Sequence, residues 1–141
     1  MSETHTEGVD LNPLIRSELA PYATAANCTL AGPPVLLAAN AAYALAMTLH
    51  ELATNAAKYG ALSQPGGHVL VRWTLAGIQA ATLTICWEER GGPQVALPAR
   101  LGYGSEVIRE LVAYELGGTV DLVFARDGVR CSIELPVSSG T

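Results

Sequence analysis

The clearest pattern along the chain is an alternation of apolar and polar residues with a period of two. It occurs in HVLVRWTL (68–75) and again in AATLTICWEE (80–89), with a short AGIQ turn between them. Alternation of this kind is typical of strands that bury one face, so the two segments predict a hairpin. TVDLVFA (119–125) and VRCSIELP (129–136) repeat the pattern around an Asp-Gly turn at 127–128 and predict a second hairpin.

Two other segments predict short helices. The first should begin with Asp10 or Asn12 as its N-cap and stop near Pro21. The second, GSEVIRELVAYEL (104–116), precedes a Gly117-Gly118 pair that should end it.

A long helix is predicted from about Ala38 to Tyr59, with Gly60 in position to end it. At 100° per residue, one stripe of small and apolar side chains should pack on the sheet. This stripe contains Leu45, Leu49, Leu52, Ala56 and Tyr59.

The order of elements determines the expected fold class. A short strand, CTLAG (28–32), lies between the first two helices, and a loop rich in glycine and proline (90–104) separates the two hairpins. We therefore expect an α/β (α+β) two-layer sandwich, with a mainly antiparallel mixed sheet of about five strands covered on one face by about three helices. Residues 1–9 are interpreted as a disordered lead-in, 10–137 as one domain and 138–141 as a tail.

Composition narrows the class of ligand. The chain has 141 residues, half of them hydrophobic, and a net charge of −5. An acidic chain is a poor sequence-independent nucleic-acid binder, although a local pocket could still bind phosphate through backbone N–H groups and a lysine.

The apolar run PPVLLAANAAYALAMTL contains prolines and an asparagine and leads into charged residues, so we interpret it as a buried helix that makes no membrane contact. Three widely spaced cysteines predict neither a disulfide framework nor a zinc knuckle.

The long helix carries a polar edge beside its apolar stripe. Glu51, Asn55 and Lys58 are spaced by four and then three residues, which aligns them on the helix. They could form a solvated Glu51–Lys58 pair beside Asn55, or a site in which hard oxygen donors meet Mg²⁺ and the lysine meets a phosphate. His50 points about 100° away from Glu51 and is interpreted as a packing or hydrogen-bonding histidine. A zincin motif is excluded because Thr54 stands where its second histidine would be.

Two glycine clusters, ERGGP (89–93) and GYGSEVI (102–108), flank the predicted loop. The second opens a helix, so N–H groups at Gly104 and Ser105 could face an anion, although a turn with an N-cap explains the same residues. A P-loop motif does not occur in the chain.

The three segments in this order resemble the ATP-binding domain shared by gyrase, ninety-kilodalton heat-shock chaperones, mismatch-repair proteins and histidine kinases. HELATNAAKYGALS, WEERGGP and GYGSEVI are similar in particular to the HWE histidine kinases. That family is named for a histidine in its asparagine box and a W-x-E in its first glycine box. The corresponding residues here are His50, Trp87 and Glu89.

The resemblance implies roles on the long helix. Asn55 would hold the Mg²⁺ that bridges the ATP phosphates, and Glu51 matches an acidic position associated with proton transfer or water orientation. Lys58 would contact phosphate, and Tyr59 would lie against the nucleotide.

It also implies roles in the glycine-rich segments. Glu89 stands where related kinases have an aspartate that binds the adenine amino group, and Gly91 would keep that wall thin, whereas Pro93 replaces the box's last glycine. Gly102, Gly104 and Ser105 would receive the phosphates, with Tyr103 in place of a common phenylalanine. Residues 92–101 would form a short ATP lid.

No histidine in the chain has the setting of a phosphoacceptor, since His5 lies in a polar tail, His50 in the nucleotide helix and His68 at a strand start. The resemblance therefore implies a cytoplasmic, ATP·Mg²⁺-binding catalytic domain of a bacterial two-component histidine kinase. It would act on a histidine of a separate dimerisation and phosphoacceptor domain, would reach a response regulator indirectly, and would be weakly active alone. The alternative is a non-catalytic module of the same fold that regulates a partner protein by docking.

Overall fold

The strands form one mixed five-stranded sheet. The computed structural model of the chain describes residues 8–78, 80–93, 105–125 and 127–138. Its main strands are β2 (Cys28–Ala31), β4 (His68–Ala76), β5 (Ala80–Arg90), β6 (Thr119–Ala125) and β7 (Gly128–Ser138). Their order in the sheet is β2-β4-β5-β7-β6, which brings the two predicted hairpins together through β5 and β7.

All neighbouring strands except one pair are antiparallel. β4 and β5 form the first hairpin and β6 and β7 the second, as predicted. β2 runs parallel to β4, which is possible because the long helix between them provides the crossover connection. In the centre of the sheet Trp87 pairs with Val71 on one side and with Cys131 on the other.

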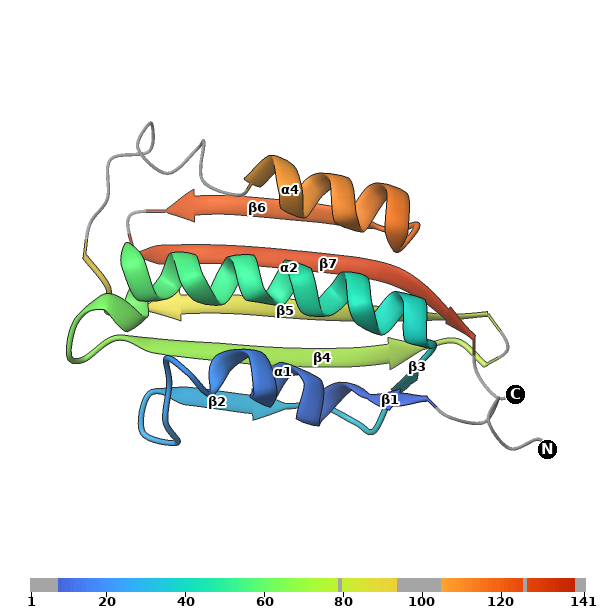
Figure 1. Cartoon of the computed structure of the whole chain (residues 1–141), viewed down its shortest axis with the longest axis horizontal. Helices are drawn as coiled ribbons and strands as arrows, with labels where there is room; N and C mark the ends of the chain where they lie inside the picture. The colour runs from blue at the N-terminus through green and yellow to red at the C-terminus, as the bar shows by residue number, and fades with distance from the viewer. Residues whose placement is uncertain (1–7, 79, 94–104, 126, 139–141) are drawn as a thin grey trace.

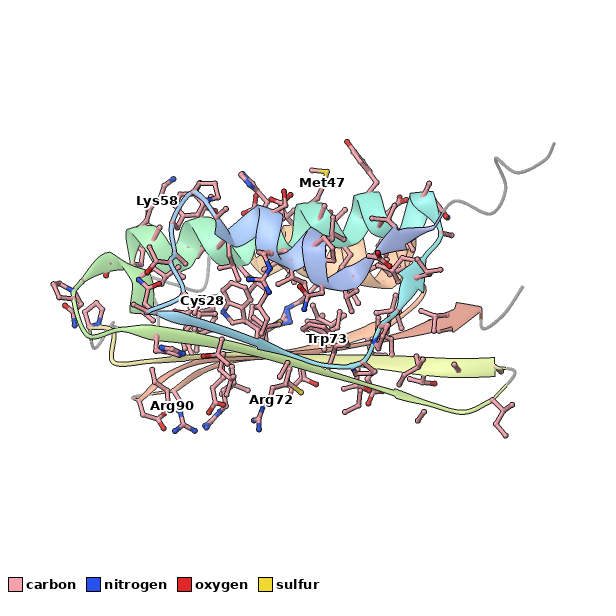
Figure 2. The ribbon with its side chains drawn as sticks, turned by 90° about the horizontal axis from the view of Figure 1, so that it is seen from below. Cys28, Met47, Lys58, Arg72, Trp73 and Arg90 are labelled. Carbon is pink, nitrogen blue, oxygen red and sulfur yellow. The ribbon has the colours of Figure 1, made fainter. Side chains whose placement is uncertain are left out.

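The helices lie on one face of this sheet (Figures 1 and 2). They are α1 (Leu11–Leu19), α2 (Ala39–Lys58), a short 3-10 turn η2 (Ala61–Ser63) and α4 (Ser105–Glu110), which continues into a π-helical turn η3 (Leu111–Glu115). The expected two-layer sandwich with helices on one side is confirmed.

The core lies between the two layers. Leu45, Leu49, Leu52 and Ala56 of the predicted α2 stripe are all buried, while Tyr59 is half-buried at the end of the helix. Every second residue of β5 from Ala81 to Glu89 is buried against them. The buried face of the strand, with its period of two, therefore packs on the buried stripe of the helix, with its period of 3.6 residues, as the sequence pattern indicates.

A second, two-stranded sheet was not predicted. In it β1 (Val9–Asp10) pairs with β3 (Leu36–Leu37). Val9 therefore belongs to an ordered strand rather than to the predicted lead-in, and β7 extends to Ser138, one residue beyond the predicted domain end. Strands of two residues carry too little alternation to be recognised in a sequence.

The third helix also differs from the prediction in its last turn. The Leu116 N–H donates to the Leu111 carbonyl at 3.1 Å, five residues back, so the helix widens into a π turn. Gly117 then takes a left-handed φ of 66°, which confirms it as the terminating glycine.

Among the described residues, no helix combines the length and the apolar character needed to cross a bilayer. Cys28, Cys86 and Cys131 are all free thiols.

Candidate functional site

Three segments end at the same edge of the sheet. The last turn of α2, the end of β5 and the adjoining ends of β6 and β7 all lie at the left in Figure 1. The residues that the sequence singled out on α2 and β5 are therefore close to this edge.

The polar edge of α2 approaches this region from the helix layer. Glu51 and Asn55 are half-buried, and Lys58 is exposed. Figure 2 shows Lys58 near the end of α2, on the side of the helix away from the sheet. No ion pair joins Glu51 to Lys58 among the described residues, so the simple surface pair that the spacing also allowed does not form.

His50 points elsewhere. Its Nδ1 lies 3.5 Å from Oε1 of Glu18 on α1, and more than half of its side chain is exposed. His50 thus contacts the neighbouring helix and not the edge formed by Glu51 and Asn55.

On β5, the alternation that builds the core also turns one carboxyl group inward. Leu83, Ile85 and Trp87 are buried, and two residues after Trp87 the side chain of Glu89 faces the same way. Glu89 is only 3% exposed, one of two buried polar residues among the described part of the chain. A buried carboxyl group needs hydrogen-bond donors.

Glu89 has such donors from two different elements. The backbone N–H of Ala61, in the turn after α2, donates to its Oε1 at 3.1 Å. The indole Nε1 of Trp87 donates to its Oε2 at 3.0 Å. Each oxygen is thus fixed by a separate donor, one from the helix layer and one from the sheet.

A hollow opens beside this carboxyl group, and we call it the Glu89 hollow. Besides Glu89, the described residues that line it include Gly60 and Ala61 after α2, Gly92 and Pro93 after β5, and Phe124 and Gly128 from the second hairpin. It therefore lies at the sheet edge where the three segments end.

Glycines bring the walls of the hollow close together. A Cβ on Gly60 would lie 2.2 Å from Oε1 of Glu89, and one on Gly92 would lie 2.8 Å from the backbone nitrogen of Ala61. A Cβ on Gly128 would lie 1.7 Å from the backbone oxygen of Glu89. Side chains at these three positions would push the segments apart, so the hollow depends on glycine.

The structure requires a glycine at position 60 for a reason other than the end of the helix. Gly60 was expected to end α2, and its φ of −115° is one that any residue can adopt. α2 does end next to it, with Tyr59 as C-cap. Gly60 is needed because of its contact with Glu89, a residue 29 positions away that no local pattern relates to it.

Gly91 and Pro93 occupy different places at the end of β5. Gly91 has a left-handed φ of 77°, and a Cβ on it would lie 2.5 Å from the carbonyl oxygen of Gly66. It therefore packs against the loop before β4, whereas Gly92 and Pro93 line the hollow. Gly60, Ala61, Gly92 and Gly128 were not among the candidate site residues, and only their glycine-rich context could have drawn attention to them.

The second glycine cluster is largely outside the described residues. This holds for Gly102, Tyr103, Gly104 and most of the predicted lid at 92–101. Ser105 is the first residue of α4, in agreement with the predicted helix start.

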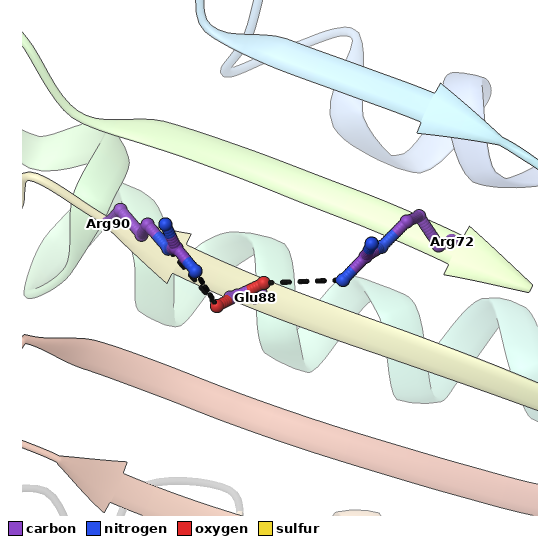
Figure 3. A network of polar contacts seen from close by, with 3 residues as sticks. All are labelled: Arg72, Glu88 and Arg90. Carbon is purple, nitrogen blue, oxygen red and sulfur yellow. Dashed lines mark hydrogen bonds and ion pairs between the residues drawn. The ribbon is translucent and has the colours of Figure 1, made fainter.

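The opposite face of the sheet carries a separate group of charges. Figure 3 shows Glu88 between two arginines, with its Oε1 3.7 Å from Nη2 of Arg72 and its Oε2 2.6 Å from Nη2 of Arg90. The hydrogen bond from Arg90 to Glu88 raises the pKa of this guanidinium above its usual value. Arg72 and Arg90 project from the side of the sheet away from the helices (Figure 2), so this network is not part of the hollow.

Known proteins resemble this chain in sequence over nearly its whole length. Blue-light-activated histidine kinase 1 of Erythrobacter litoralis is 36% identical over 143 residues, which cover 97% of this chain and 38% of that protein. Blue-light-activated histidine kinase of Brucella ovis is 33% identical over 134 residues, covering 93% of this chain and 27% of that protein. The chain thus spans well under half the length of these relatives. No family model matches it.

Solved structures show the same fold. The histidine kinase domain of Erythrobacter litoralis EL346 has a TM-score of 0.69 at 18% identity, covering 97% of this chain and 66% of that one. The mycobacterial sensor histidine kinase MprB has a TM-score of 0.66 at 21% identity, covering 94% of this chain and 97% of that one. The catalytic domain of histidine kinase ThkA gives 0.62 at 16%, with coverages of 94% and 97%.

The sequence matches and the structural matches both name histidine kinases. The sequence match extends over nearly the whole chain, and the fold is that of kinase catalytic domains. Of the three residues that the sequence predicts as a signature, Trp87 contacts Glu89 directly. The chain therefore has the fold of histidine kinase catalytic domains and resembles blue-light-activated histidine kinases in sequence over nearly its whole length.

Proposed function

We propose that this domain binds ATP with Mg²⁺ and donates the γ-phosphoryl group to a histidine on a separate dimerisation and phosphoacceptor domain. The similarity to relatives named as histidine kinases supports the reaction class. Since phosphoryl transfer depends mainly on positioning and charge stabilisation, the domain should be weakly active or inactive without an acceptor.

The buried carboxyl group of Glu89 is the observation that carries this proposal. It lines a hollow at the sheet edge and is held by two donors, so its oxygens have defined positions. We assign it to the amino group of adenine, because a carboxylate accepts hydrogen bonds and an exocyclic amino group donates them.

The triphosphate is assigned to the polar edge of α2. Asn55 would hold the Mg²⁺, Lys58 would contact a phosphate as a point charge, and Tyr59 would lie against the nucleotide. Glu51, one turn before Asn55, would orient the acceptor or take its proton.

The donor set near α2 fits magnesium that arrives with a nucleotide. Among the described residues no group of three or more His, Cys, Asp or Glu side chains could hold a metal ion. Mg²⁺ commonly uses one or two protein oxygens and completes its shell with substrate phosphates and water, which matches a single amide from Asn55. The bound ion would neutralise charge on the phosphates.

The glycine-rich segments complete the proposed site. Gly91 would support the wall beside adenine, and Gly102, Tyr103, Gly104 and Ser105 would receive the phosphates. Ser105 starts α4, and a helix start is a favourable place for an anion.

We further propose a cytoplasmic location and two partners. The first is the helical phosphoacceptor domain, and the second is a response regulator that receives the phosphoryl group from it. ThkA has been crystallised in complex with the response regulator TrrA, which supports this second partner for a chain of the same fold.

Titration calorimetry with ATP, in the presence and absence of Mg²⁺, tests the proposal on this chain. Magnesium-dependent binding is the expected result, and addition of a kinase phosphoacceptor domain with labelled ATP should then produce a phosphohistidine. Absence of nucleotide binding would contradict the proposal and favour the alternative, a non-catalytic module that docks on a partner.

A further inference from the structure

We propose that Trp87 is a positioning residue that orients the Glu89 carboxylate and thereby sets the preference of the Glu89 hollow for a purine with a 6-amino group. The inference rests on the proposed assignment of Glu89 to adenine. It adds a residue that would not touch the nucleotide but would decide how selectively the nucleotide base is read.

Two donors from different elements bind the two carboxylate oxygens of Glu89. Trp87 donates to Oε2 from the same strand, and Ala61 donates to Oε1 from the turn after α2. Because side chains two residues apart on a strand share a face, position 87 is the place on β5 from which a donor reaches Glu89 along the sheet.

The residue type at position 87 matters for the same reason. The preceding inward residues of β5, Leu83 and Ile85, are purely apolar. Tryptophan fills the core in the same way but carries one N–H donor on its ring. Trp87 is 1% exposed, so water does not compete for this hydrogen bond.

Close packing further limits the position of the carboxyl group. The Cα of Gly60 lies so near Oε1 that a Cβ there would be 2.2 Å from that oxygen. Loss of the Trp87 hydrogen bond would remove a donor from Oε2 while Oε1 stayed against Ala61, so the plane of the carboxyl group would be less constrained.

Orientation of an acceptor is what distinguishes purines at this position. A 6-amino group donates a hydrogen bond to a carboxylate. A 6-oxo group is itself an acceptor and repels the carboxylate, and an unsubstituted carbon neither donates nor accepts. A site built around such a hydrogen bond rejects analogues that lack the donor, and it loses that discrimination when the acceptor is misplaced.

The chain contains a matched control. Trp73 on β4 is also inward and buried, at 2% exposure, and its indole Nε1 donates to the Pro33 carbonyl at 2.7 Å. Trp73→Phe therefore removes the indole hydrogen bond of another buried tryptophan without removing a contact of Glu89. Trp87→Phe keeps an aromatic ring in the core and removes the N–H donor to Glu89.

The test is titration calorimetry of wild type, Trp87→Phe and Trp73→Phe with the magnesium complexes of ATP, GTP and purine riboside triphosphate, which lacks the 6-amino group. We expect wild type and Trp73→Phe to prefer ATP over purine riboside triphosphate by the same ratio. In Trp87→Phe this ratio should fall by roughly tenfold or more, the range of one hydrogen bond to a charged group.

Two outcomes overturn the inference while leaving the proposed function intact. One is ATP binding in Trp87→Phe with an unchanged ratio, and the other is an equal weakening of all three nucleotides, which a purely structural role would produce. A wild type that binds no nucleotide would overturn the proposed function, and the inference with it.

A second measurement needs no folded Trp87 variant. The chain has two tryptophans, so its ¹H–¹⁵N spectrum contains two indole N–H resonances, and Trp73→Phe assigns them. The Trp87 resonance should shift on addition of Mg·ATP, and shift less with purine riboside triphosphate, while that of Trp73 stays in place. A Trp87 resonance that ATP binding leaves unmoved would overturn the inference.

Discussion

Glu88 and Glu89 are neighbours with the same side chain but opposite surroundings. Glu88 faces away from the helices and pairs with Arg72 and Arg90, whereas Glu89 is buried and accepts from the N–H groups of Ala61 and Trp87. The difference follows from the strand period alone, because successive side chains point to opposite faces. An exposed ion pair contributes little, so the chemistry is expected at Glu89.

This contrast gives a prediction for the pair. Glu89→Ala should weaken ATP binding by about 1–3 kcal/mol, the cost of leaving the adenine amino group without its acceptor. Glu88→Ala should leave the affinity unchanged. Calorimetry on both folded variants measures the difference, and equal binding of ATP and GTP by the wild type would show that Glu89 does not read adenine.

Asn55→Ala tests the proposed metal ligand. The variant should lose the magnesium-dependent part of its ATP affinity and keep its fold, because Asn55 is only half-buried on α2. Asn40→Ala removes the same amide from an exposed position in the first turn of α2 and should bind ATP like the wild type. An unchanged magnesium dependence in Asn55→Ala would refute the assignment of this residue.

At the scale of elements, α2 both packs on the sheet and carries the polar edge. Its apolar stripe includes Leu45 and Leu49, which are 0% and 1% exposed, while Glu51, Asn55 and Lys58 occupy the adjacent stripe. Packing of the leucines thus fixes where the polar edge lies relative to the end of β5.

Leu49→Ala should therefore lower the free energy of unfolding by about 2–5 kcal/mol, through lost burial and a residual cavity. Met47→Ala, at a position that is 41% exposed on the same helix, should cost less than about 1 kcal/mol. Urea unfolding followed by circular dichroism gives both values. Similar losses in the two variants would contradict the role of the stripe.

At the scale of the whole molecule, burial should make stability depend on alkaline pH. Cys131 lies inward on β7 opposite Trp87, and burial raises the pKa of its thiol from 9.0 to about 12. Between these values the unfolded chain loses the proton and the folded chain keeps it. The contribution of the neutral thiol is therefore fully present below about pH 9 and is lost as the pH rises toward 12.

The variant Cys131→Val isolates the contribution of the thiol, because valine has a volume similar to that of cysteine and does not titrate. The stability of wild type relative to the variant should decrease by about 1 kcal/mol between pH 8 and pH 10, since one pKa unit corresponds to about 1.4 kcal/mol. Urea unfolding at the two pH values measures it. A relative stability that is constant with pH would contradict the prediction.

The sequence predicted most of the elements correctly, for reasons that are local. Period-two alternation gave both hairpins, and the 3.6-residue period gave α2 with its buried leucines. Local periodicity did not predict the pairing of β1 with β3 or the π turn after α4, since the first involves two residues per strand and the second only five residues.

Some features of the candidate site also follow from local periods, and others follow only from tertiary packing. The sequence by itself determined which residues are proposed to carry the chemistry. It also determined that Glu51, Asn55 and Lys58 share an edge of α2 and that Trp87 and Glu89 share a face of β5, because helix and strand periods fix these relations. Only the tertiary structure decided that Glu89 meets Ala61 and Gly60, or that Gly92 and Gly128 close the walls of its hollow. These contacts join segments far apart in the chain, and their distances depend on how the helix layer packs on the sheet, which no local period encodes.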